Sequence, residues 1–588
     1  MKKEMGKKKK KETAKKEIKK GRKSVRIIDL EGQEALSAFM SNDFYCTTEL
    51  PEYFDFTGVL EYAAKSIGDK TLAQCAAEET DPQTLSDVNL NVLTNKDGKY
   101  AVRPLTLANP FLYYMLARDI CSAKSWAAIQ ECFRLYGGNP HIRACAIPRV
   151  KRHDRPDPFK NATAILNWWN SMEQRSLELS LKYRWMFITD ITNCFGQINP
   201  ESITAALARK GTTHETPGNA ALAAKIQHYL RAMQEGKNIG IPQGSYLFAL
   251  IAEIVLGYID MLLARKIGEA QQRGTLDGDL EYEVIRYVDD YRIFCNDREA
   301  LDTISYILQH LLDEFNFRMN TSKTCTTSDL ITGTLKPDKA FYIFNTPVIG
   351  KQIFTDENGV MHTTRVCDFA GFQKHLLFIF EFSKRFPDSG QLVRQLEEFS
   401  ERIEDFVNPR SEMEKRLEKA GWVTVAVYGD DKKKGEKEEK RFLWENISAM
   451  VAITVEIAAR NLRAAHNALK IASLLLANMR PSEAKKKKEI IHLIYKKLKW
   501  THNAAFLQVW MQNITHTTDD WSAGDVYDMP LCRVVARQPV TLWNNSWLRP
   551  EIASGFPQDS IVDRDALSKT GQVITFKSKR RYDESTAE

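Results

Sequence analysis

Apolar and polar positions along the chain follow two different patterns. Before about residue 350, short runs of aromatic and β-branched residues, such as 183–190 and 285–294, predict buried strands. Before and after these runs, apolar residues return at helical spacing over 58–67, 111–122 and 301–315. This part of the chain is therefore expected to be α+β, with an antiparallel sheet and helices.

The second pattern begins after residue 365. There the apolar positions keep helical spacing and predict a mostly helical region, interrupted by a charged, glycine-containing loop at 429–441. Residues 521–547 are rich in aromatic and apolar side chains and are expected to pack against these helices. The predicted helical segments are 369–386, 390–406, 443–479 and 483–511.

Three aspartates stand at predicted strand ends. Asp190 closes the run 183–190, and Asp289 and Asp290 form a tight turn between two strand-like runs. Acidic pairs in hairpin turns are usually only solvated, so the pair alone is weak support for a site. With Asp190 added, the three carboxylates could hold two Mg²⁺ ions, or Mn²⁺, about 3.5–4 Å apart for in-line phosphoryl transfer.

Further segments accompany these acids in a recognisable order. Residues 240–248 (GIPQGSYLF) place small residues before a helix, and residues 320–324 (NTSKT) contain Lys323. Upstream, Arg103 begins the sequence RPL, shortly before Asn109-Pro110. Together with the aspartates, these segments resemble motifs A to D and the fingers segment of the reverse transcriptase family, with the acid pair in its YVDD form.

This resemblance implies catalysis and metal binding by the three aspartates, with Lys323 protonating the departing pyrophosphate. Phe195 resembles the steric gate, which excludes a ribose 2′-hydroxyl and so favours deoxynucleotides. Taken singly, Lys323 is typical of a solvated surface lysine, Phe195 of a core residue and Arg103 of a strand-edge arginine; their joint order favours the functional interpretation. The residues implied to contact the nucleotide are Arg103, Phe195, Gln243, Gly244 and Ser245.

Length, composition and cysteine spacing limit the class of protein. At 588 residues, 43% of them hydrophobic, the chain exceeds what one core usually supports, so two or three domains are expected. No uninterrupted apolar span of membrane length and no signal peptide are evident, which predicts a protein without a membrane partner. The ten cysteines form no CxxC pair, so neither structural zinc nor a disulfide framework is expected.

The excess positive charge is concentrated at the N-terminus. Residues 1–26 carry fourteen lysines and arginines against three glutamates, a charge of +11, so residues 27–588 sum to −4 within the total of +7. This lysine-rich tail is expected to be disordered; it could collect nucleic acid by counterion release or serve only for solubility. A basic stretch at 149–155 could line a local nucleic-acid channel.

The expected organisation has four parts. A lysine-rich tail (1–26) is followed by a fingers region (27–180), a reverse transcriptase palm (181–350) and a helical C-terminal domain that replaces the thumb (351–588). Within the palm, residues 340–350 could form a hairpin that grips a primer.

This layout is similar to that of bacterial abortive-infection (AbiK-like) and other defence-associated, unknown-group reverse transcriptases. The resemblance implies a bacterial cytoplasmic enzyme that makes DNA in anti-phage defence, using a protein hydroxyl as primer and no conventional template.

Two other functions remain open from the sequence. One is RNA-templated cDNA synthesis on a noncoding RNA, as in retrons or intron-borne enzymes. The other is a nucleic-acid-binding sensor with vestigial polymerase motifs, against which the presence of all three aspartates and Lys323 speaks. The expected partners are deoxynucleoside triphosphates, a nucleic acid product, a noncoding RNA or a partner protein, and further copies of the chain in a homo-oligomer.

Overall fold

The computed structural model describes most of the chain between residues 24 and 575. Almost all of the lysine-rich tail, most of the stretches 149–155 and 340–350, and the loop at 429–441 lie outside the described residues. The described residues are 24–78, 80–95, 102–151, 169–210, 215–216, 219–335, 337–338, 341, 351–355, 361–365, 370–407, 447–479, 481–499, 501, 505–516 and 527–575.

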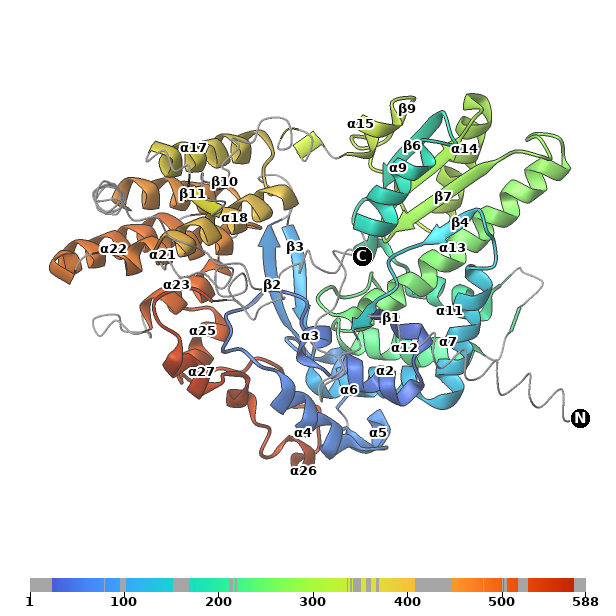
Figure 1. Cartoon of the computed structure of the whole chain (residues 1–588). Helices are drawn as coiled ribbons and strands as arrows, with labels where there is room; N and C mark the ends of the chain where they lie inside the picture. Colours follow the sequence, from blue (N-terminus) through green and yellow to red (C-terminus); the bar gives the residue numbers. More distant parts are fainter. Residues whose placement is uncertain are drawn as a thin grey trace, which may run out of the picture.

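A five-stranded sheet positions the three aspartates (Figure 1). Its order is β4–β7–β8–β6–β9, and all neighbours are antiparallel except β4 and β7. The strand-forming runs predicted around Asp190 and around the acidic pair are confirmed as β6, β7 and β8. The strands are β4 (Ile142–Ala144), β6 (Trp185–Asp190), β7 (Tyr282–Tyr287), β8 (Asp290–Cys295) and β9 (Cys325–Thr327).

Helices cover both faces of this sheet. On one face, α13 (Tyr246–Gln272) and α14 (Arg298–Glu314) contribute their apolar residues to the main hydrophobic core. On the other face, a smaller core contains residues from the strands together with Leu179 of α9 (Arg175–Leu179) and Leu330 of α15 (Leu330–Thr334). The sheet is therefore buried on both sides, which explains its nearly continuous apolar strands.

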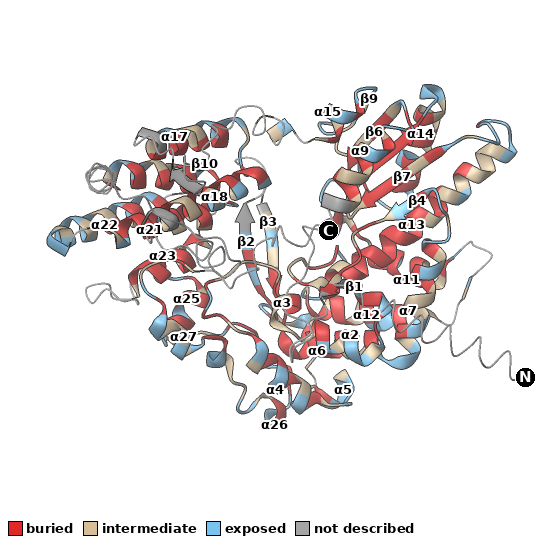
Figure 2. Ribbon diagram, in the orientation of Figure 1, coloured by how far each residue is buried: buried red, intermediate tan, exposed pale blue. Residues whose placement is uncertain are grey.

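Helix α13 is long and apolar enough, by length and composition alone, to cross a membrane. However, 83% of its most apolar stretch is buried inside the protein, as expected for a core helix (Figure 2). Glu253 and Asp260 interrupt that stretch, which is why the sequence predicted no uninterrupted apolar span. One such helix is weak support for a membrane location.

The N-terminal region combines helices with a hairpin of β2 and β3. Two predicted helices, 58–67 and 111–122, are confirmed as α4 and α6; α6 is capped by the Asn109 side chain, which accepts bonds from two backbone N–H groups. The elements up to α12 are β1 (Ser24–Arg26), α2 (Gly32–Phe39), α3 (Asn42–Tyr45), α4 (Thr57–Ile67), α5 (Leu72–Cys75), β2 (Leu90–Asn95), β3 (Val102–Leu107), α6 (Pro110–Cys121), α7 (Ala123–Tyr136), β5 (Arg149–Lys151), α10 (Cys194–Gln197), α11 (Pro200–Ala208) and α12 (Ala220–Ala232).

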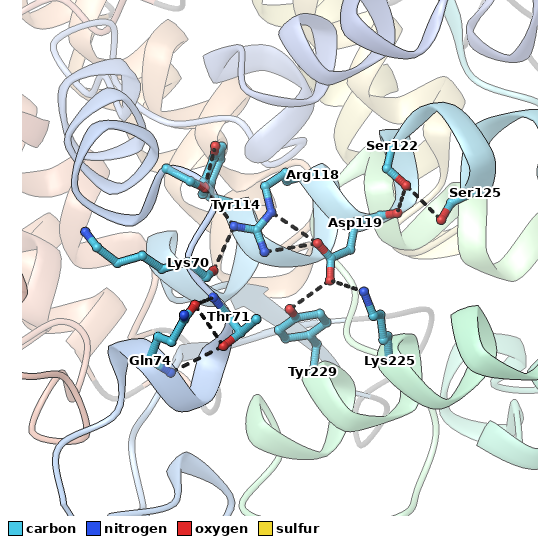
Figure 3. A network of polar contacts seen from close by, with 11 residues as sticks. Lys70, Thr71, Gln74, Tyr114, Arg118, Asp119, Ser122, Ser125, Lys225 and Tyr229 are labelled. Carbon is cyan, nitrogen blue, oxygen red and sulfur yellow. Dashed lines mark hydrogen bonds and ion pairs between the residues drawn. The ribbon is translucent and has the colours of Figure 1, made fainter.

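A polar network ties α6 to its neighbours (Figure 3). The Arg118 guanidinium donates to the carbonyls of Gly68 and Lys70 at 2.7 and 2.9 Å, in the connection between α4 and α5. The adjacent Asp119 accepts a bond from the Tyr229 hydroxyl at 3.1 Å and pairs with Lys225 at 3.4 Å, both on α12. Arg118 therefore links α6 to the connection between α4 and α5, and Asp119 links it to α12.

The C-terminal part is helical, as the apolar spacing predicted. In Figure 1 its helices lie to the left of the five-stranded sheet, with the β2–β3 hairpin between the two groups. A two-stranded hairpin of β10 and β11 precedes the helices. These elements are β10 (Lys351–Thr355), β11 (Met361–Arg365), α17 (Ala370–Arg385), α18 (Gly390–Val407), α21 (Ala465–Ala477), α22 (Ala484–Lys499) and α23 (Leu507–Thr515).

The last described segment, 527–575, contacts both halves of the molecule. Its beginning packs on α23, where the Gln512 amide donates to the Cys532 carbonyl at 2.9 Å. Residues 543–562 instead run along the N-terminal region, and the Trp543 indole donates to the Leu107 carbonyl at 3.0 Å. The expectation that 521–547 packs against the C-terminal helices is confirmed for its first described residues, whereas residues 543–547 lie along the N-terminal region instead. The segment's helices are α25 (Pro530–Val535), α26 (Pro550–Ala553) and α27 (Arg564–Lys569).

Candidate active site

The register of β6 and β8 brings the three aspartates to one end of the sheet. Asp190 is paired directly with Asp290, and the Ile191 N–H donates to the Asp289 carbonyl at 3.0 Å. Directly opposed residues in an antiparallel pair have Cβ atoms about 4.5–5.5 Å apart. Carboxylates that are a hundred residues apart in sequence are thus neighbours in space.

The turn between β7 and β8 is strained. Only Val288 and Asp289 separate the strands, and Val288 has a φ of +53°. A positive φ at the first of two turn residues is the pattern of a type II′ turn, where glycine is usual. For a β-branched residue it costs about 1–3 kcal/mol, so the surrounding structure must hold this turn in place.

Lys323 lies at the acidic cluster, and its role toward a pyrophosphate stays a prediction. Its Nζ donates to Asp190 Oδ2 at 2.8 Å, and the Asn320 N–H donates to the Asp190 carbonyl at 2.8 Å. The Lys323 side chain is 53% exposed, so it can move at little cost. By contrast, Asp190 Oδ1 is buried and has no hydrogen-bond partner among the described residues.

An unpaired buried carboxylate oxygen fits a cation ligand, because burying it unpaired is otherwise unfavourable. Within the described part of the chain, however, no three His, Cys, Asp or Glu side chains stand in an arrangement that could hold a metal ion. Lys323 occupies one oxygen of Asp190, and carboxylates without a cation between them repel one another. Ion binding at these residues therefore requires Lys323 to leave Asp190 and the carboxylates to converge.

The glycine-containing loop 240–244 lies between α10, which follows strand β6, and the β2–β3 hairpin. Gly240 has a φ of +54°, and a Cβ there would lie 2.8 Å from the backbone of Gly196. Gly244 has a φ of +131°, and its Cβ would lie 2.7 Å from the Thr106 carbonyl oxygen. The small residues are thus required by close backbone approach on both sides.

Backbone hydrogen bonds hold this loop on both sides. The Ile241 N–H donates to the Phe195 carbonyl at 2.9 Å, and the Thr106 N–H donates to the Gln243 carbonyl at 2.6 Å. Phe195 is partly buried in α10, next to the loop, and its role as a gate stays a prediction. Ser245 is buried and caps α13 through its hydroxyl, so its predicted nucleotide contact competes with a structural role.

Arg103 lies on β3, opposite Thr94 on β2. It is half-buried and stands three residues, about 10 Å, before Thr106 along the strand. The bond from Thr106 to Gln243 links its strand to the glycine-containing loop. The structure thus connects the Arg103 strand to the site through the backbone, and its contact with a triphosphate stays a prediction.

Three buried charges beside the turn were not predicted from the sequence. Arg286 on β7 is 0% exposed, and Glu253 and Asp260 on α13 are 1% and 2% exposed. Burial raises the pKa of both carboxyls, and the Arg286 guanidinium opposes that rise. Their only signal in the sequence is a charge inside an otherwise apolar run.

Comparison with known families identifies the segment that carries this site. Residues 146–373 match the family model described as "Reverse transcriptase (RNA-dependent DNA polymerase)". The chain contains a reverse transcriptase domain. The matched segment includes the three aspartates, Phe195, the glycine-containing loop and Lys323, and it leaves Arg103 outside. The match indicates an RNA-directed DNA polymerase, and the family implies nucleotides as substrates and nucleic acid as template and product.

Solved structures similar to this chain include telomerases. One is telomerase from Candida albicans in complex with a TWJ fragment of telomeric RNA, at 9% identity and a TM-score of 0.28, covering 73% of this chain and 67% of that chain. Another is apo telomerase from Candida tropicalis truncated from the C-terminal domain, at 14% identity and a TM-score of 0.28, covering 45% of this chain and 54% of that chain. Similarity at this level supports no inference about function. None of the curated proteins matches the sequence at a significant level.

Proposed function

We propose that the reverse transcriptase domain adds deoxynucleotides by two-metal phosphoryl transfer at Asp190, Asp289 and Asp290. The observation that carries this proposal is the register of β6 and β8, which sets Asp190 across from Asp290 beside the Asp289 turn. Mg²⁺ is the proposed ion, with Mn²⁺ as a substitute, because carboxylate oxygens suit both. When bound, the ions would activate a 3′-hydroxyl and neutralise the triphosphate.

The other residues of the site have separate tasks in this proposal. Lys323, whose side chain is 53% exposed, moves from Asp190 to the departing pyrophosphate and donates a proton there. Phe195 packs against the sugar and excludes a 2′-hydroxyl. Arg103 binds the triphosphate, as a planar guanidinium suits phosphate oxygens.

We further infer a role in anti-phage defence, with a protein hydroxyl as primer and no conventional template. The support is the layout of the chain, in which helices α17 to α23 follow the reverse transcriptase domain, similar to the defence-associated reverse transcriptases. A second candidate function is cDNA synthesis on an RNA template. It is favoured by the description of the matching family as an RNA-dependent DNA polymerase.

The test uses purified full-length protein with Mg²⁺ and labelled deoxynucleotides, with and without added RNA. Labelled product that stays attached to the protein until protease is added supports protein priming, whereas product that requires RNA supports templated synthesis. D289A/D290A should abolish incorporation, since it removes two of three proposed ligands. D277A/D279A removes two exposed aspartates from the loop before β7 and should leave incorporation unchanged. Incorporation by the folded D289A/D290A variant would overturn the assignment of the site.

A further inference from the structure

Arg286 stands at an unusual place for a charged residue. It is the penultimate residue of β7, three positions before Asp289, and its side chain is completely buried. Along β7, Arg286 and Val284 face α13, while Ile285 belongs to the smaller core on the other face of the sheet. A leucine at this position would fill the same space without a buried charge.

All three nitrogens of the Arg286 guanidinium donate hydrogen bonds to carboxylates of α13. Nε donates to the two carboxylate oxygens of Asp260 at 3.1 and 2.9 Å. Nη1 and Nη2 donate to the two oxygens of Glu253 at 2.9 and 3.1 Å. Glu253 and Asp260 are seven residues apart, two turns of the helix, so they lie on one face of α13. Tyr291, the residue after Asp290 on β8, donates from its hydroxyl to Asp260 at 3.2 Å.

One further bond reaches the turn itself. Arg286 Nη1 donates to the Val288 carbonyl at 3.1 Å. Val288 is the residue with the positive φ, and its carbonyl belongs to the peptide group that leads directly into Asp289. This bond therefore acts at the strained point of the acidic turn.

A buried cluster of one cation and two anions is a poor way to gain stability. Charges lose their hydration on burial, and replacing such clusters by apolar residues is often neutral or stabilising. What the cluster provides is a fixed orientation of the Arg286 side chain, because a planar guanidinium can bind several acceptors only in one orientation. Helix α13 begins at Tyr246, directly after the glycine-containing loop, so the cluster joins the turn to the helix that starts at this loop.

We propose that Arg286 is a positioning residue, which with Glu253 and Asp260 locks the Val288 turn to α13 and so presents Asp289 and Asp290 for metal binding. This inference rests on the proposed function, since it assigns those aspartates to metal. Side chains that orient metal ligands typically change metal affinity 10- to 100-fold when they are replaced. The same order of effect is expected here.

The first test is R286K in the full-length protein. Lysine keeps the positive charge but is a point donor, so it cannot bind Glu253, Asp260 and the Val288 carbonyl together. Mn²⁺ binding to the nucleotide-free protein, measured by electron paramagnetic resonance, should weaken about tenfold or more. The kcat for deoxynucleotide incorporation should fall about 100-fold, while KM stays within about threefold of wild type.

R292K is the matched control. Arg292 is also buried, on β8 of the same hairpin, but it faces the other side of the sheet, where it donates to Ser176 and to the Thr334 carbonyl at 2.8 and 3.2 Å. R292K should lower the melting temperature as much as R286K does, with Mn²⁺ affinity and kcat within about threefold of wild type. Equal losses of Mn²⁺ affinity in the two variants would mean that Arg286 acts only through stability and would overturn the proposal.

Two more variants separate positioning from folding. E253L/D260L/R286M keeps apolar packing between α13 and the hairpin, so it should fold and still lose Mn²⁺ affinity. Glycine adopts a positive φ without strain, so V288G removes the strain that Arg286 must hold in the turn. In the V288G background, R286K should therefore lower kcat by less than about fivefold. Retained Mn²⁺ affinity in the triple variant, or an R286K loss that V288G leaves unchanged, would overturn the proposal. If wild type incorporates no nucleotide, the proposed function fails, and the Mn²⁺ titration still decides the role of Arg286.

Discussion

Replacing Trp543 tests whether the C-terminal segment holds the β2–β3 hairpin. The indole is 1% exposed and donates from Nε1 to the Leu107 carbonyl at 3.0 Å, at the end of β3. Its ring lies 6.5 Å from that of Phe56 and 6.0 Å from that of Phe556. The side chain thus joins three segments that are far apart in the sequence.

The expected loss follows from these contacts. Removing a buried tryptophan side chain costs about 3–5 kcal/mol. Leaving the Leu107 carbonyl without its partner costs about 1–3 kcal/mol, and part of this cost is already included in the first figure. We expect W543A to lower the free energy of unfolding by about 4–5 kcal/mol. W543F keeps most of the ring and loses the hydrogen bond, so it should cost about 1–2 kcal/mol. For a cooperative unit of 150–250 residues, W543A should lower the melting temperature by about 10–15 °C.

The assay combines thermal unfolding with nucleotide kinetics. W510A is the control, because Trp510 on α23 is equally buried and stacks on His466 at 5.5 Å, away from β3. Both alanine variants should unfold earlier, but only the Trp543 variants should raise KM for deoxynucleotides, since β3 carries Arg103. A melting temperature for W543A within about 2 °C of wild type would refute the expected packing loss. An unchanged KM in W543F would refute the link from Trp543 to the nucleotide site.

Three further predictions concern single side chains. F195A should lower the preference for deoxynucleotides over ribonucleotides, measured as the ratio of kcat/KM values, by about 10- to 100-fold, because it removes the proposed gate; an unchanged ratio would count against that role. K323A should lower kcat by about 100-fold yet tighten Mn²⁺ binding two- to fivefold, on the order of one exposed ion pair, because Lys323 competes for Asp190; weaker Mn²⁺ binding would contradict that competition. Burial and the nearby Arg402 lower the pKa of His375 to about 4. Below its ordinary pKa of about 6.5 the unfolded chain binds the extra proton and the folded chain does not, so stability should fall by about 3 kcal/mol as the pH drops from 6.5 to 4. In chemical unfolding of H375Q, the free energy of unfolding should change less with pH across this range than in wild type. Equal slopes in the two proteins would refute the lowered pKa of His375.

Local features of the sequence determined much of the fold. Strand β6 and the hairpin of β7 and β8 follow from runs of aromatic and β-branched residues, and their acids fall at strand ends as expected. The predicted helix 111–122 is found as α6, because apolar spacing acts over a few turns. The helical C-terminal part likewise follows from apolar spacing. These predictions succeeded because the interactions behind them join residues that are close in the chain.

Only the tertiary structure decided which distant residues meet. No periodicity predicts that Lys323 binds Asp190, that Arg286 is buried against Glu253 and Asp260, or that Trp543 donates to the end of β3. Each of these contacts joins segments 26 to 436 residues apart. Their formation depends on how whole faces pack and on which buried polar groups find partners, and a buried charge looks the same in the sequence as a solvated one. The sequence therefore identified the acids of the proposed site, and the packing of α13 against the β7–β8 hairpin, together with the contact from Lys323, decided how those acids are held.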